Sequence, residues 1–139
     1  MSQNHDDPFI AYVKDKNTKE LVSNRHFFDI RTGYAFIKKL EEEDKAKGTY
    51  IEGRYDLYDD KDQCISDLKL YLTDDFGELI SEEPLGKDGR SSVEHAEIII
   101  KGLLEDQAEE MKYDSSYPEV ISRNSFDIVD QNHRSVIIK

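Results

Sequence analysis

In the stretch LYDDKDQCI, residues 57–65, polar residues typical of a turn lie between apolar ends. The same spacing recurs in VKDKNTKEL, residues 13–21, and in IVDQNHRSV, residues 128–136. In each, an apolar residue is followed by one spacer and then Asp, with Lys or Asn two residues later. Asp bonds the backbone two residues on, and Asn tolerates left-handed backbone, so both suit a β-hairpin tip. The pattern predicts three hairpins, with tips near 15–19, 59–63 and 130–134. Turn chemistry alone or internal duplication explains the recurrence, and we favour turn chemistry because such short signatures are generic.

The flanks of these turns favour strands. Phe, Tyr, Val and Ile are frequent in residues 9–14 and 21–29, and the last turn lies between residues 125–129 and 135–138. Two segments alternate in the way a half-buried strand does. In residues 49–58, one face would carry Ile51, Tyr55 and Leu57, and the other Glu52, Arg54 and Asp56. In residues 66–72, the face toward the core would carry Leu68, Leu70 and Leu72.

Two helices are predicted between the hairpins. The first covers about residues 32–46, with an apolar stripe that includes Ile37 and a C-cap at Gly48. The second covers about residues 92–112, with Ser91 as N-cap and Glu94 at the third helical position. An acidic connection, residues 73–90, precedes the second helix.

Together these elements predict an α+β fold: an antiparallel sheet built from three β-hairpins with two helices, in the order ββ-α-ββ-loop-α-ββ. A chain of 139 residues is normally one domain, so we expect a flexible tail at residues 1–8 and a single α+β domain at 9–139. The predicted core residues are Leu68, Leu70, Ile100, Leu103, Phe126 and Ile128.

The negative charge is concentrated in the middle of the chain. Residues 49–119 carry 20 acids and 7 bases, whereas residues 1–48 carry 9 of each and residues 120–139 carry 2 acids and 3 bases. A concentrated negative field attracts basic partners and repels nucleic acid and anionic membranes. The longest apolar run, residues 9–13, is far too short to span a bilayer. The charge therefore favours a basic protein partner and excludes direct contact with nucleic acid or membrane.

Two acidic clusters are the candidate partner-binding surface. One lies at the second hairpin tip and one in the acidic connection, where Phe76 or Leu79 would add an apolar anchor. The residues are Asp59, Asp60, Asp62, Asp74, Asp75, Glu78, Glu82 and Glu83. A calcium loop starting at Asp60 fails, because Ile65 stands where that motif requires Gly. Solvated, merely solubilising loops are the alternative interpretation.

The sequence predicts no catalytic residue, metal or cofactor. No two of the four histidines have a metal-ligand spacing, and the aspartates around Cys64 would raise the pKa of its thiol and disfavour the reactive thiolate. The single cysteine excludes an internal disulfide, which favours a reduced, cytoplasmic setting.

The leading hypothesis is a small acidic intracellular protein, not an enzyme, that presents a negative face to a basic protein partner, as inhibitors, immunity proteins and nucleic-acid mimics do. One alternative is a small enzyme or small-molecule sensor with a pocket between sheet and helices. Another is a structural subunit of a larger assembly, which an exposed apolar patch would indicate. The sequence does not identify the partner or the oligomeric state.

Overall fold

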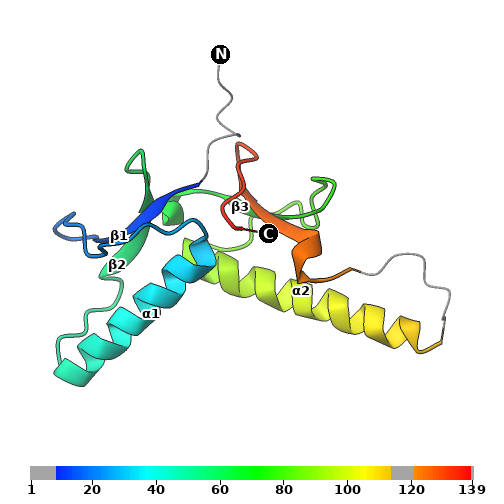
Figure 1. The fold of residues 1–139 in the computed structure, drawn as a ribbon, viewed down its shortest axis with the longest axis horizontal. Helices are drawn as coiled ribbons and strands as arrows, with labels where there is room; N and C mark the ends of the chain where they lie inside the picture. The colour runs from blue at the N-terminus through cyan, green and yellow to red at the C-terminus, as the bar shows by residue number, and fades with distance from the viewer. Residues whose placement is uncertain (1–8, 114–120, 139) are drawn as a thin grey trace, which may run out of the picture.

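The computed structural model describes residues 9–113 and 121–138 and has an α+β fold (Figure 1). Its helices and strands follow the chain in the order β1, α1, β2, β3, α2, β4. Their bounds are Ala11–Asp15, Ile30–Lys47, Tyr55–Asp59, Leu70–Asp74, Gly89–Met111 and Phe126–Asp130. Both helices lie on one side of the sheets, and most of the turns project on the other side (Figure 1). The predicted tail, residues 1–8, lies outside the described residues.

The α+β class and the antiparallel pairing are confirmed, but the strands do not pair as three hairpins. β1 pairs with β2, with Ala11 opposite Asp59, and β3 pairs with β4, with Leu70 opposite Asp130. The result is two sheets of two strands each. Each strand therefore finds its partner on the far side of a helix and not across its own turn. The predicted order ββ-α-ββ-loop-α-ββ is wrong for this reason.

The chain does turn where predicted, but the segments that return from the turns are too short to form strands. After β2, the Asp59 amide donates to the Gln63 carbonyl at 2.9 Å, and then only Cys64 bridges back, to Tyr58. The chain next winds into a short 3-10 helix at Ile65–Asp67, which ends the pairing. The returns after β1 and β4 also make isolated bridges, Lys14 with Leu21 and Val129 with Ser135.

A fourth turn of the same kind follows β3, inside the stretch predicted to be an acidic connection. Every strand ends in an Asp whose carboxylate accepts backbone N–H groups of its own turn; the four are Asp15, Asp59, Asp74 and Asp130. At Asp74, Oδ1 accepts from the amides of Phe76 at 2.8 Å and Glu78 at 3.0 Å. Gly77 supplies the left-handed residue of this turn, with φ of 82°.

The two halves of the chain repeat one plan of strand, helix and strand. The helix N-caps, Asp29 and Asp88, each lie 14 positions after the last residue of the preceding strand, Asp15 or Asp74. The start of each helix also forms a hydrogen bond with the other half of the chain. The Ile30 amide donates to the Val136 carbonyl at 2.9 Å, and the Gly89 amide donates to Ser66 Oγ at 3.1 Å. The repeat thus extends beyond turn chemistry, which favours internal duplication.

The first helix is close to its predicted bounds, and the second begins earlier than predicted. α1 ends at Gly48, which has φ of 73° as a left-handed C-cap. The N-cap of α2 is Asp88, so the prediction of Ser91 as N-cap with Glu94 at the third position was wrong. The Asp88 carboxylate accepts the Ser91 amide at 2.8 Å, and Ser91 Oγ accepts the Asp88 amide at 3.2 Å. Ser91 thus closes the capping box from its far end.

The core lies between the sheets and the helices and combines both halves of the chain. Of the six predicted core residues, Leu70, Ile100, Phe126 and Ile128 are buried. Leu68 and Leu103 are only half-buried. Leu103 belongs to the second half of α2, which runs past the sheets (Figure 1).

Candidate functional site

At the first predicted acidic cluster, the turn after β2, only part of the charge faces solvent. Asp59 is 5% exposed, and its carboxylate accepts the Lys61 and Gln63 amides at 2.9 Å and Arg134 Nη2 at 3.1 Å. Asp62 is exposed and forms an ion pair with Lys14. Asp60 is exposed at the tip. The Asp59 carboxylate therefore stabilises the fold. This turn presents less negative charge to a partner than the sequence indicates.

The second predicted cluster is more accessible. Asp74 is half-buried and caps its turn, whereas the other four acids are exposed: Asp75, Glu78, Glu82 and Glu83. There is no Lys or Arg between Lys69 and Lys87. We call residues 74–83 the acidic loop. Its charge has one sign along ten successive positions.

Apolar side chains are exposed on the same loop. Phe76 is 82% exposed, Leu79 47% and Ile80 38%. Single exposed apolar residues are ordinary on protein surfaces, but a group rimmed by polar side chains is typical of an interaction site. The loop thus combines an apolar centre with an acidic rim.

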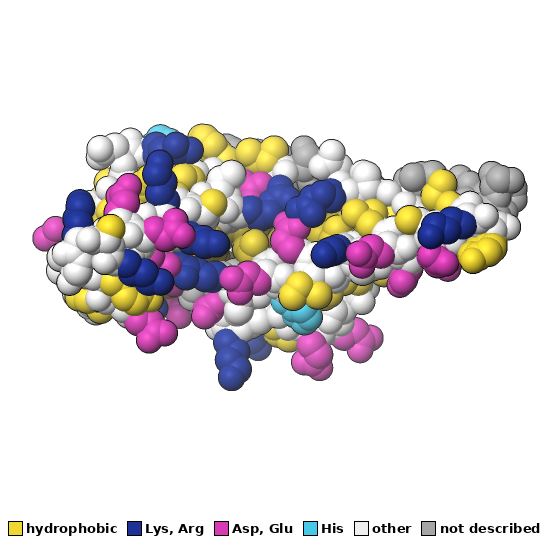
Figure 2. All heavy atoms as spheres, turned by 90° about the horizontal axis from the view of Figure 1, so that it is seen from below, with side chains coloured by type: hydrophobic (Ala, Val, Ile, Leu, Met, Phe, Trp, Pro, Cys, Tyr) yellow, Lys and Arg dark blue, Asp and Glu magenta, His cyan; other side chains and the backbone are white. Residues whose placement is uncertain are grey.

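The two acidic clusters project on the same side of the sheets but are separate. Figure 1 shows the turn 59–63 and the acidic loop away from the helices, with the turn 130–134 between them in this view. Arg134, from that intervening turn, bonds to Asp59 and Asp130. The helix side differs, because Figure 2 shows Lys and Arg side chains interspersed with Asp and Glu over it.

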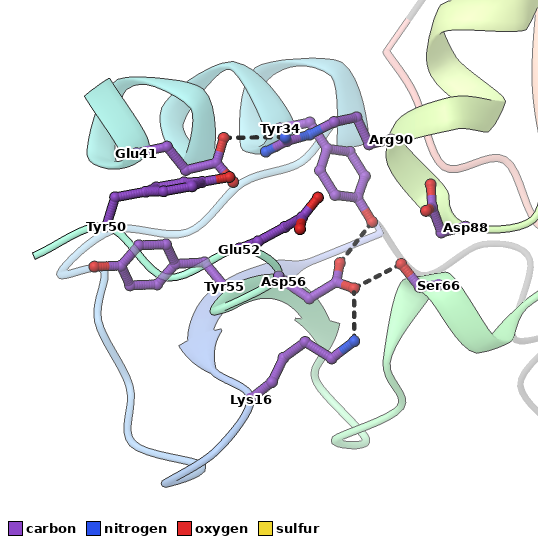
Figure 3. Close-up of a pocket in the computed structure, with 11 residues that line it drawn as sticks. Lys16, Tyr34, Glu41, Tyr50, Glu52, Tyr55, Asp56, Ser66, Asp88 and Arg90 are labelled. Carbon is purple, nitrogen blue, oxygen red and sulfur yellow. Dashed lines mark hydrogen bonds and ion pairs between the residues drawn. The ribbon is translucent and has the colours of Figure 1, made fainter. Parts of the chain in front are cut away.

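A pocket of about 260 Å³ lies between β2, α1 and the start of α2 (Figure 3). Its base is Asp56, which is 5% exposed. The Asp56 carboxylate accepts hydrogen bonds from Tyr34 Oη at 2.8 Å and Ser66 Oγ at 2.6 Å, and Lys16 Nζ lies 3.9 Å away. Alternation in residues 49–58 groups Asp56 with the polar face of the strand, but Tyr34 and Ser66 cover it in the structure.

The upper part of the pocket carries charged and aromatic side chains. Arg90 Nη1 lies 3.0 Å from Glu41 Oε1 and links the start of α2 to α1. Tyr50 and Tyr55 line the side opposite α2, and Glu52 extends between them and Asp56 (Figure 3). Sequence reasoning missed these residues, because only the packing of α1 against β2 brings them together.

The pKa values of two tyrosines that line the pocket, and of the cysteine that contacts Asp56, are raised. Burial, and then the charge of Asp56, raise the pKa of Tyr34 well above its ordinary value. Burial and a hydrogen bond to Asp44 raise the pKa of Tyr55 to about 12. Burial and Asp56 also raise the pKa of the Cys64 thiol. At neutral pH these hydroxyl and thiol groups are therefore hydrogen-bond donors and not anions.

Two of the described histidines, His26 and His95, contact structural neighbours. His95 Nδ1 lies 2.6 Å from the Leu85 carbonyl oxygen, and the His26 ring packs edge-on against Tyr12 and Phe28. Within residues 9–113 and 121–138, no three His, Cys, Asp or Glu side chains are grouped so as to hold a metal ion.

Neither helix within the described ranges has the length and apolarity needed to cross a membrane. Comparisons of the chain with protein-family models, curated proteins and solved structures found no match.

Proposed function

We propose that this protein binds a basic protein partner and that the acidic loop, residues 74–83, is the contact surface. The observation that carries the proposal is the combination on one loop of exposed acids with Phe76, which is 82% exposed. Binding of the inhibitor, immunity or nucleic-acid-mimic type would follow if the loop occupied a basic groove of the partner. A cytoplasmic location remains a prediction from the single cysteine.

The two kinds of side chain have different roles in this proposal. The carboxylates attract the partner from a distance and speed its association, an effect that added salt screens. Phe76 slows dissociation, since burying an exposed Phe side chain is worth about 1.5–3 kcal/mol. Binding should therefore weaken with salt without vanishing.

The test uses affinity capture from the native cell at low and high salt with three baits. These are the unmodified protein, a loop variant and a control variant. The loop variant is Glu82→Lys/Glu83→Lys with Phe76→Ser, which leaves the turn cap Asp74 intact. The control is Glu109→Lys/Glu110→Lys, which changes the net charge by the same amount at exposed positions in the last turn of α2.

The proposal requires a basic protein that the unmodified and control baits capture and the loop variant does not. Titration calorimetry with the purified partner should then show a loss of about tenfold or more in affinity for Phe76→Ser alone. If the loop variant captures the same proteins as the control, or if no captured protein is basic, the proposal is wrong.

A small-molecule sensor is the second candidate, and the observation that favours it is the polar pocket on Asp56. The two functions use different segments of the chain, so they can be tested separately.

A further inference from the structure

The charges that line the pocket do not balance. Four carboxylates and two cations line it. Arg90 is paired with Glu41, and Lys16 is the cation nearest Asp56, at 44% side-chain exposure. The two remaining carboxylates are Glu52 and Asp88. The pocket therefore carries an excess of two negative charges and disfavours an anionic ligand.

Glu52 is the carboxylate best placed to meet a ligand. Its side chain points toward the middle of the pocket, over Asp56 (Figure 3). Among the described residues, no hydrogen-bond or ion-pair partner of Glu52 is found, whereas Asp88 accepts the Ser91 amide at the positive end of α2. Glu52 thus offers a negative charge that the fold itself does not use.

Tyrosine rings next to Glu52 suit the same kind of ligand. The Lys45 ammonium lies 4.7 Å from the Tyr50 ring centroid, and the Arg54 guanidinium lies 5.1 Å from that of Tyr55. Each ring therefore already contacts one cation of the protein, and a ligand cation would meet the remaining ring surface. Tyr55 is held in place by a 2.7 Å hydrogen bond to Asp44. A ring already held in place loses little entropy when a ligand binds.

Comparison of the two halves shows which contacts of this pocket are not repeated in the second half. Asp127 stands at the position of Asp56, three residues before the turn Asp, and accepts Ser135 Oγ at 2.6 Å. At the position of Tyr34, five residues after the helix N-cap, α2 has the apolar Val93. The Tyr34 bond to Asp56 is thus particular to one half.

We infer that the pocket binds a small organic cation, with an ammonium or guanidinium group against Glu52 and an alkyl part against the tyrosine rings. Its volume of about 260 Å³ lies below the roughly 300–1,000 Å³ typical of drug-sized ligand sites, so the ligand is short. The cation could be a free amine or the side chain of a Lys or Arg residue, since both present the same group.

The test is a titration of the full-length protein, followed by amide chemical shifts. The probes are butylamine and butylguanidine, with 1-butanol as neutral and butyrate as anionic comparison. Two blocked pentapeptides, with a central Lys or Arg between glycines, represent the side-chain source. The variants are Glu52→Gln and Tyr50→Leu, and their controls are Glu43→Gln and Tyr113→Leu at exposed positions outside the pocket.

We expect saturable binding of a cationic probe, with shifts around Asp56 and the start of α2. Glu52→Gln should weaken binding about fivefold to tenfold, and Tyr50→Leu about twofold to fivefold, while the controls leave it unchanged. Tighter binding of a peptide than of the free amines would identify a side chain as the source, and the reverse would identify a metabolite. If 1-butanol binds as well as butylamine, if Glu52→Gln has no effect, or if no probe saturates, the inference is wrong.

Discussion

Replacing two glycines of α2 by alanine should change stability in opposite directions. A Cβ added at Gly89, the first residue of the helix, would lie 1.9 Å from Tyr34 Oη and 2.5 Å from Tyr34 Cζ. A Cβ added at Gly102, in the middle of the same helix, would meet no atom within 4 Å. The two substitutions are chemically identical, so their difference reports only the surroundings.

The expected magnitudes follow from these contacts. Gly102→Ala should raise the free energy of unfolding by about 0.5–1 kcal/mol, because alanine favours the helix interior. Gly89→Ala must displace the buried Tyr34 ring, and overpacking costs about 1–3 kcal/mol. If Tyr34 moves, its 2.8 Å bond to the buried Asp56 is also lost, at a further cost of about 1–3 kcal/mol. We expect Gly89→Ala to destabilise by about 2–6 kcal/mol in total.

Urea unfolding measures both effects, and a Tyr34→Phe background identifies the cause. Removing the hydroxyl removes the closest contact, so Gly89→Ala should cost less in that background than in the unmodified protein. If Gly89→Ala is neutral or stabilising, or costs the same in both backgrounds, Tyr34 does not pack on the start of α2. The pocket wall described above would then be wrong as well.

Two further predictions concern acid stability and the core. Burial opposes ionisation of Asp29, but hydrogen bonds from the Arg31 side chain and the Ile138 and Arg31 amides outweigh it and lower the pKa of Asp29 from its ordinary 3.8. The ionised Asp29 therefore stabilises the fold above about pH 4, and this stabilisation is lost as the pH falls through the lower pKa of the folded state. Asp29→Asn should reduce stability at pH 7 and make the decline of stability below about pH 4 less steep. Urea midpoints measured against pH test both results. In the core, Ile100→Ala should cost about 2–5 kcal/mol by the same assay and Leu103→Ala clearly less, since Ile100 is 5% exposed and Leu103 is half-buried; equal midpoints would contradict the packing of α2.

The features that the sequence predicted correctly are local ones. The turns at Asp15, Asp59 and Asp130 form where expected, because an Asp carboxylate reaches amides only two to four residues away. The end of α1 at Gly48 is equally local, since a left-handed cap needs only a residue without a side chain. The turn at Asp74 has the same chemistry, and its acidic neighbours led us to assign it to a connection.

The features that the sequence did not predict depend on distant contacts. β1 pairs with β2 across α1, and the turn pattern that predicted the hairpins does not distinguish this pairing from a return across the strand's own turn. The start of α2 was ambiguous locally, because Asp88 and Ser91 are both good N-caps; the structure uses them as the two ends of one capping box. The burial of Asp56 was not predictable from alternation, since Tyr34 lies 22 positions away in the chain.

The concentration of acids in the middle of the chain has two separate causes in the structure. Asp59 and Asp74 accept backbone amides of their own turns, a role that Asp15 and Asp130 also fill in the neutral arms. These four residues serve folding, so their charge says nothing about a partner. The exposed excess that remains includes Glu78, Glu82 and Glu83, and these lie on the loop that also exposes Phe76. The number of acids in the sequence therefore overstates the charge that is available to a partner. The acidic loop, where exposed acids and apolar side chains occur together, is the part that a partner can contact.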